Sequence, residues 1–160
     1  MNALLTLPVL LPLLAAGACI VAGRSKTAQR VISLVALTVV TALSIVLAVV
    51  VDRDGTVAVQ AGGWPAPIGI TLVADRLSAM MLAVASVMLL AVLVYAIGQP
   101  GAERNHVGFQ SVYLILASGV ALSWALWRAP GDVWHVGHAL GFCFFAAAIA
   151  VRFVAAASAY

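Results

Sequence analysis

The stretch VISLVALTVVTALSIVLAVVV, residues 31–51, decides the fold class of this chain. It contains no charged residue, and it is long enough to cross the roughly 30 Å hydrocarbon core of a bilayer as a helix. Its many β-branched residues favour a strand in water, but in lipid the backbone amides must be hydrogen-bonded within the segment itself. The stretch therefore predicts a transmembrane α-helix.

Outward from this stretch, four more runs of similar length lack charged residues. Pro8 and Pro12 lie in the first of them, where neighbouring helices can satisfy the carbonyl groups that a proline leaves free. Together the five runs predict an all-α integral membrane protein with five transmembrane helices, organised as a single membrane domain over residues 1–160. The other four predicted spans are residues 3–23, 77–98, 109–127 and 133–151.

The composition supports a membrane protein and excludes other classes. Apolar residues make up 65% of the chain and charged residues 8%, whereas soluble domains contain about 25% charged residues. The net charge of +3 is too small for the basic surface that neutralises nucleic-acid phosphates. Cys19 and Cys143 lie in apolar runs without a metal-binding spacing, so we interpret them as buried hydrophobic residues. The predicted partner is the lipid bilayer, not nucleic acid.

The positive charges predict an orientation. Arg24, Lys26 and Arg30 follow the first span with no acidic residue among them, and short loops rich in Lys and Arg lie on the cytoplasmic side. The N-terminus is then outside, and five spans place Tyr160 in the cytoplasm. We predict a multi-pass protein of the plasma membrane with this topology.

The longest connection, residues 52–72, predicts a short external β-hairpin between the second and third spans. Val57 and Val59 alternate with other residues, Gly62-Gly63 is a turn signal, and a second alternation runs over residues 68–72. An irregular loop on the membrane surface is the alternative.

Two adjoining runs here carry a family resemblance. VQAGGWPAPIGI (residues 59–70) and LVADRLSAMM (residues 72–81) resemble the D subunit of Mrp-type multisubunit cation/proton antiporters, which is similar to the proton-pumping membrane subunits of respiratory complex I. LPVLLPLL (residues 7–14) and YLILASGV (residues 113–120) also resemble this family, so the resemblance covers about residues 1–123. It implies a Na⁺/proton transport subunit rather than an enzyme, with other antiporter-complex membrane subunits as partners and no cofactor.

The chain departs from the family beyond about Ser123. Family members have about fourteen helices and carry transport on a glutamate in the fifth and a lysine in the seventh. If Gly131-Asp132 is aligned with the family's Gly-Asp pair, the glutamate position falls at Gly141, and the predicted fifth span has no carboxylate. We expect a truncated, divergent or frameshifted amino-terminal portion that lacks the transport residues itself. A small membrane structural or assembly protein without transport activity is the alternative.

Polar residues near the predicted helix ends are the remaining candidates. Asp75 precedes the third span, where an N-cap and an ion-entry role are both open. Asp132, His135 and His138 are spaced three apart, which favours interfacial packing but is compatible with a proton relay through His138. Gly137 and Gly141 suit close helix packing. The sequence predicts no metal site, and haem ligation by the histidines would need a partner histidine deep in another span.

Overall fold

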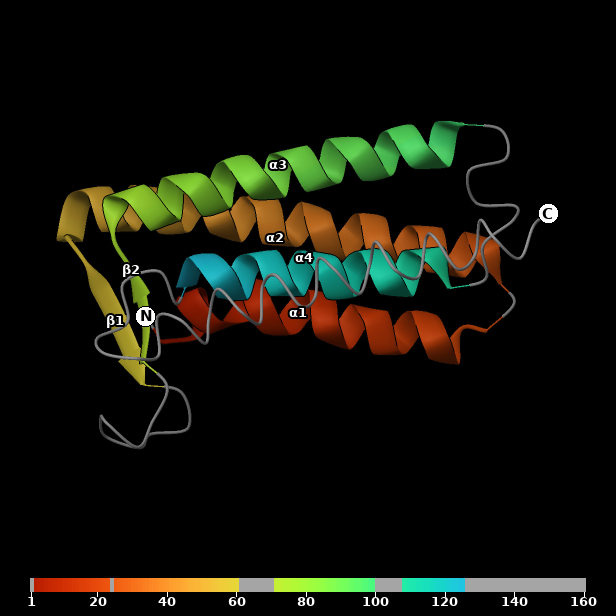
Figure 1. Cartoon of the computed structure of the whole chain (residues 1–160), viewed down its shortest axis with the longest axis horizontal. Helices are drawn as coiled ribbons and strands as arrows, with labels where there is room; N and C mark the ends of the chain where they lie inside the picture. The colour runs from red at the N-terminus through yellow and green to blue at the C-terminus, as the bar shows by residue number, and fades with distance from the viewer. Residues whose placement is uncertain (1, 24, 61–70, 100–107, 126–160) are drawn as a thin grey trace.

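A computed structural model of the chain describes residues 2–23, 25–60, 71–99 and 108–125, and the statements below concern these residues. Four helices lie side by side with a two-stranded sheet across one end of them (Figure 1). The helices are α1 (Asn2–Val21), α2 (Lys26–Asp54), α3 (Arg76–Gly98) and α4 (Phe109–Ala125). The strands are β1 (Val57–Gln60) and β2 (Thr71–Ala74).

Three of these helices, α1, α2 and α3, are long and apolar enough to cross a membrane, and α4 is a shorter apolar helix. The predicted all-α membrane fold is confirmed at this level. The predicted fifth span, residues 133–151, lies outside the described residues, so the number of five spans stays a prediction. α2 is longer at both ends than the predicted span of residues 31–51. The charged residues at both ends of α2 lie outside the apolar run but still within the helix.

The connection between α1 and α2 is short and satisfies its own backbone groups. Gly23 has a positive φ of 57°, a conformation that glycine adopts without steric cost. The Ser25 hydroxyl accepts the Ala28 N–H at 3.4 Å and caps α2. The Gln29 side-chain Nε2 donates to the Cys19 carbonyl at 3.1 Å and to the Gly23 carbonyl at 2.6 Å. Gln29 thereby satisfies the Cys19 carbonyl in the last turn of α1 and the Gly23 carbonyl just beyond the helix.

The predicted hairpin between the second and third spans is confirmed as a two-stranded antiparallel sheet. β1 and β2 are antiparallel, and the register pairs Val57 with Ala74 and Gln60 with Thr71. Residues 61–70, with the predicted turn at Gly62-Gly63, lie outside the described residues, so that turn stays a prediction. β2 shares Thr71 and Leu72 with the alternation predicted at residues 68–72 and continues to Ala74.

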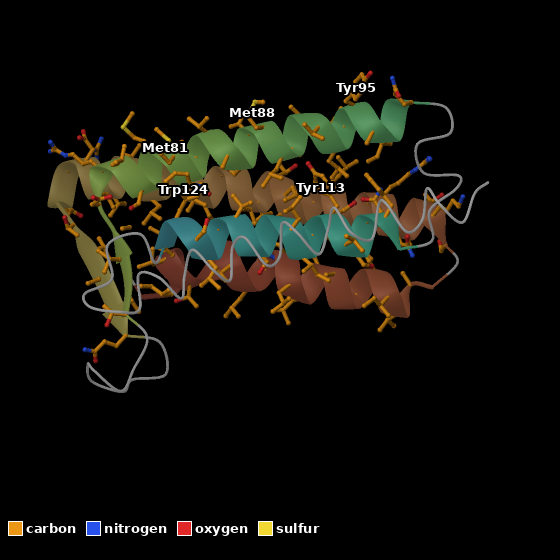
Figure 2. The ribbon with its side chains drawn as sticks, viewed as in Figure 1. Met81, Met88, Tyr95, Tyr113 and Trp124 are labelled. Carbon is orange, nitrogen blue, oxygen red and sulfur yellow. The ribbon has the colours of Figure 1, made fainter. Side chains whose placement is uncertain are left out.

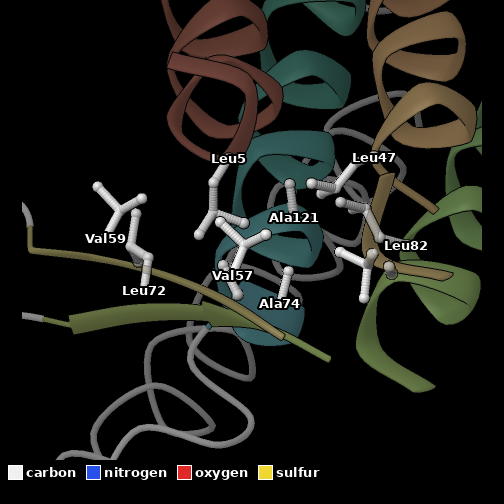
Figure 3. Close-up of a cluster of buried hydrophobic side chains, with 11 residues drawn as sticks. Leu5, Leu47, Val57, Val59, Leu72, Ala74, Leu82 and Ala121 are labelled. Atoms are coloured by element: carbon white, nitrogen blue, oxygen red, sulfur yellow. The ribbon is translucent and has the colours of Figure 1, made fainter. Parts of the chain in front are cut away.

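The inner face of the sheet packs on the ends of the helices. Val57, Val59, Leu72 and Ala74 are buried and join one hydrophobic cluster with side chains of all four helices (Figure 3). A second cluster at the opposite end of the bundle contains Cys19, Leu37, Leu93 and Leu114. The hairpin thus covers one end of the bundle, called the hairpin end below, and the α1–α2 connection lies at the other, called the loop end (Figure 1).

The helices differ in how much of their surface the bundle covers. α1 packs against α2 and α4, and α3 packs against α2 and α4. Large apolar side chains on α1, α2 and α3 remain exposed, including Leu14 and Met88. Every residue of α4 is buried or half-buried. Exposed apolar faces of this extent are typical of surfaces that meet lipid or other membrane helices.

Candidate functional site

Asp75 caps the start of α3 at the hairpin end. Its carboxylate Oδ1 accepts the Ser78 backbone N–H at 2.7 Å, and its own N–H donates to the Ser78 hydroxyl at 2.9 Å. This reciprocal pair is a capping box, which satisfies two amides that would otherwise lack partners. The predicted N-cap role of Asp75 is confirmed. Its candidacy for an ion pathway stays a prediction.

Arg76 pairs with the end of α2 instead of with its sequence neighbour Asp75. Its Nε lies 3.3 Å from Asp52 Oδ1, and its Nη2 donates to the Asp52 carbonyl at 3.1 Å. The two side chains are 71% and 73% exposed, so the pair contributes at most about 1 kcal/mol. Its effect is to join the ends of α2 and α3 where the hairpin leaves one helix and enters the other.

Besides the Gln29–Cys19 contact between α2 and α1, three polar contacts among the described residues connect different helices inside the bundle. The Thr41 hydroxyl on α2 lies 3.3 Å from the Ser86 carbonyl on α3, and the Tyr113 hydroxyl on α4 donates to the Leu89 carbonyl on α3 at 2.7 Å. The third contact is a side-chain pair: Ser33 Oγ lies 2.7 Å from Gln110 Oε1, and both residues are buried. Neutral groups of this kind hold helices together but do not exchange a proton near neutral pH.

Gln29, Ser33 and Gln110 were not singled out from the sequence. Each of these three lies near a helix end, where a polar residue is as easily explained by contact with headgroups as by burial. Ser33 and Gln110 are separated by 77 positions in the chain, and no periodicity links them. The available signal for a buried polar contact was Gln110, which stands next to Ser111 in an otherwise apolar run.

The interior of the described helices carries no charge. In α2 the charged residues lie at or before Arg30 and at or after Asp52, and in α3 the charged residue is Arg76 at the first position. Across the described ranges, no group of three or more His, Cys, Asp or Glu side chains could hold a metal ion. The candidates His138, Gly137 and Gly141, with Asp132 and His135, lie outside the described residues. The described helices can therefore pack and anchor, but they offer no ionisable relay between their ends.

Comparison with known proteins identifies relatives of this helix bundle. No family model matches the chain. The D subunit of the Na⁺/H⁺ antiporter of Alkalihalophilus pseudofirmus is 37% identical over 120 residues, which cover 75% of this chain and 24% of the relative. This chain is similar to an antiporter D subunit. The putative antiporter subunit mnhD2 of Staphylococcus aureus is 32% identical over 117 residues, or 73% of this chain and 24% of the relative.

The predicted resemblance to the D subunit is thereby confirmed. The chain spans about a quarter of the length of these antiporter relatives, and the 120 residues matched have nearly the extent that the sequence motifs predicted. Together with the three long apolar helices, the similarity to the D subunit supports a membrane protein.

Proposed function

We propose that this chain is a membrane subunit, or part of one, of a monovalent cation (Na⁺)/proton antiporter complex, and that it contributes a helix scaffold rather than ion-binding groups. The observation that carries the proposal is its 37% identity to the D subunit of a Na⁺/H⁺ antiporter over 75% of the chain. The apolar helices and the polar contacts between them supply the scaffold.

The scaffold role is supported by the charge distribution. A cation crossing a roughly 30 Å hydrocarbon core needs coordinating or ionisable groups near its middle, because an unpartnered charge there costs at least about 2.5 kcal/mol. In α2 the charge-free stretch between Arg30 and Asp52 spans that core. Its buried hydroxyls, among them Thr41 and Ser44, donate to backbone carbonyls of their own helix. The groups that carry ions would then belong to other parts of the complex.

The partners and topology follow from the same proposal. The exposed apolar faces of α1 and α3 are available to lipid and to other membrane subunits of the complex. The basic residues at the loop end favour the cytoplasmic side, with the hairpin end and the N-terminus outside the plasma membrane.

Antiport assays on the whole system test this function. Deleting the coding sequence from its host should lower Na⁺-dependent dissipation of a pH gradient in everted membrane vesicles, and expression of the full chain from a plasmid should restore it. Unchanged exchange in the deletion strain would contradict the antiporter role and favour a structural protein unrelated to transport.

A reconstitution experiment tests the scaffold role separately. Proteoliposomes containing the full chain alone should show no Na⁺-dependent proton movement above empty vesicles. A saturable rate in these vesicles would contradict the scaffold role. If His138→Ala abolished that rate, the transport site would lie at the histidines.

A further inference from the structure

The helices α1 and α4 have similar surroundings within the described bundle. Each packs mainly against two other helices: α1 against α2 and α4, and α4 against α1 and α3. A helix with two neighbours has one face turned away from the bundle. On α1 this face is exposed, since Leu10 is 45% and Leu14 73% exposed. The same exposure is therefore expected on the outer side of α4.

The outer face of α4 is covered instead. Leu114 and Ala121 belong to the two hydrophobic clusters of the bundle, and at 3.6 residues per turn a position two residues away points in nearly the opposite direction. Val112, Leu116 and Ser123 hold such positions, and all three are half-buried. Neither hydrophobic cluster of the described bundle includes Val112 or Leu116. The packing of the inner face of α4 therefore does not explain the burial of its outer face.

The chemistry of this outer face suits an apolar helix. The Ser123 hydroxyl donates to the Val120 carbonyl of its own helix at 2.8 Å, so it needs no partner from outside α4. Gly119 is buried and lies four residues before Ser123, and small residues let two membrane helices approach closely. The face therefore offers a smooth apolar surface to whatever packs on it.

The segment that follows α4 is placed to cover this face. α4 ends at Ala125, and the uncharged run 133–151 begins after a connection of seven residues, 126–132. Consecutive elements usually lie side by side, and a short connection between helices favours antiparallel neighbours. The run of 19 residues would be about 28 Å long as a helix, close to the 26 Å or so of the 17 residues of α4. Because α1 and α3 pack against α4 within the described bundle, the outer face is where such a neighbour fits.

We propose that residues 133–151, which lie outside the described residues, cross the membrane antiparallel to α4 and pack on its outer face. The observation that carries the proposal is the burial of Val112 and Leu116, which the clusters of the described bundle do not include. Gly137 and Gly141, the packing candidates of the sequence, belong to this segment. The proposal requires that the chain spans a membrane, and it holds whether or not the chain takes part in antiport.

Disulfide formation in membranes tests this contact. In a Cys19→Ala background, Leu116→Cys supplies one thiol and the native Cys143 the other. Leu116 lies nine residues, about 14 Å, before the end of α4, and Cys143 lies ten residues, about 15 Å, after residue 133, so antiparallel packing places them at the same depth. A disulfide forms only where the two Cβ atoms come within about 4.5 Å.

Oxidation of the full chain should then produce an intramolecular disulfide and a loss of free thiol. The cysteine of the segment is moved around one helical turn so that one position faces α4. Besides the native Cys143, the positions are, in a Cys143→Ala background, Leu140→Cys, Gly141→Cys and Phe142→Cys.

Leu10→Cys on the exposed face of α1 is the matched control. Leu10 lies about 12 Å from the hairpin end of α1, and its thiol should form no intramolecular disulfide with the same four positions. A nitroxide attached at Leu116→Cys should also be less accessible to oxygen dissolved in the bilayer than one attached at Leu10→Cys. If Leu116→Cys fails to fold, Val112→Cys repeats both measurements one turn away on the same face, paired with cysteines at residues 144–147.

Three results would overturn the proposal. High oxygen accessibility at residue 116 would show that lipid covers the outer face of α4. Low accessibility with disulfides only between two chains would show that a second copy covers it. Low accessibility without a disulfide from any of the four positions would assign the cover to another segment.

Discussion

The helices α3 and α4 have similarly apolar sequences but different surroundings. Met80, Met88 and Tyr95 on α3 are 60%, 59% and 67% exposed, and Figure 2 shows Met88 and Tyr95 on the side that faces away from the other helices. α4 has no exposed residue along its length and buries Gln110, Ser111 and Ser118. In a bilayer, lipid solvates a large apolar side chain as well as a protein core does, so small and polar residues indicate the inside of the bundle.

The largest effect on stability should come from a cavity made where a buried side chain of α4 packs in the bundle. Leu114 is fully buried, and Leu114→Ala removes packing contacts that lipid cannot replace. We expect a loss of about 2 kcal/mol in the free energy of unfolding, the low end of the range for buried leucines, because the unfolded helix in lipid also solvates leucine. Titration with SDS followed by circular dichroism measures it. A change close to zero would mean that α4 is not the enclosed helix.

The capping box of Asp75 gives the next largest effect. Asp75→Ala removes the carboxylate that accepts the Ser78 N–H at 2.7 Å, and the loss of an N-cap costs about 1 kcal/mol. Asp75→Asn retains an acceptor oxygen and should recover most of this stability in the same SDS titration. If Asn were as destabilising as Ala, the negative charge rather than the cap would be the function of Asp75.

A smaller effect should follow from removing the Ser33–Gln110 pair. Ser33→Ala deletes one partner of a buried contact between α2 and α4, and such contacts between membrane helices contribute about 0.6 kcal/mol on average. A double-mutant cycle with Gln110→Leu isolates the coupling between the two residues. Additive single and double variants would show that the pair does not hold α2 against α4.

The smallest effect is expected on the exposed face of α3. Met88→Ala should change the free energy of unfolding by less than about 0.5 kcal/mol, as for other surface substitutions. Leu114→Ala is the matched variant on the enclosed helix, measured in the same detergent. If Met88→Ala costs as much as Leu114→Ala, the contrast between the two helices is wrong and the outer face of α3 is packed.

The sequence predicted the helices well because one physical requirement determines them. Uncharged runs located α3 to within one residue of its start at Arg76. The same rule does not locate the ends of α2, since the count stops at the first charge while the helix continues through Lys26 and Asp52. Asp75 was a candidate cap because it directly precedes the third uncharged run, and its partner in the structure, Ser78, is only three residues away.

Contacts between distant segments were harder to predict. The register that pairs Val57 with Ala74 depends on how the sheet packs over the helix ends, so the alternation of residues along the chain does not determine it. The Ser33–Gln110 contact depends on how α2 and α4 pack against each other. No pattern in the sequence indicates that packing. Arg76 could be excluded as a partner of Asp75, but its pairing with Asp52 required the hairpin to bring α2 and α3 together.

The side chain of Gln29 has a consequence for how the protein is made. Ser25 and Gln29 satisfy the backbone at the α1–α2 connection from within those two segments, so this turn needs nothing from helices that emerge later from the ribosome. α1 and α2 can therefore enter the bilayer together as one helical hairpin. α4 is different, because its buried Gln110 meets Ser33 of α2 and its Tyr113 hydroxyl donates to the Leu89 carbonyl of α3. These polar contacts therefore form only with helices that precede α4 in the chain.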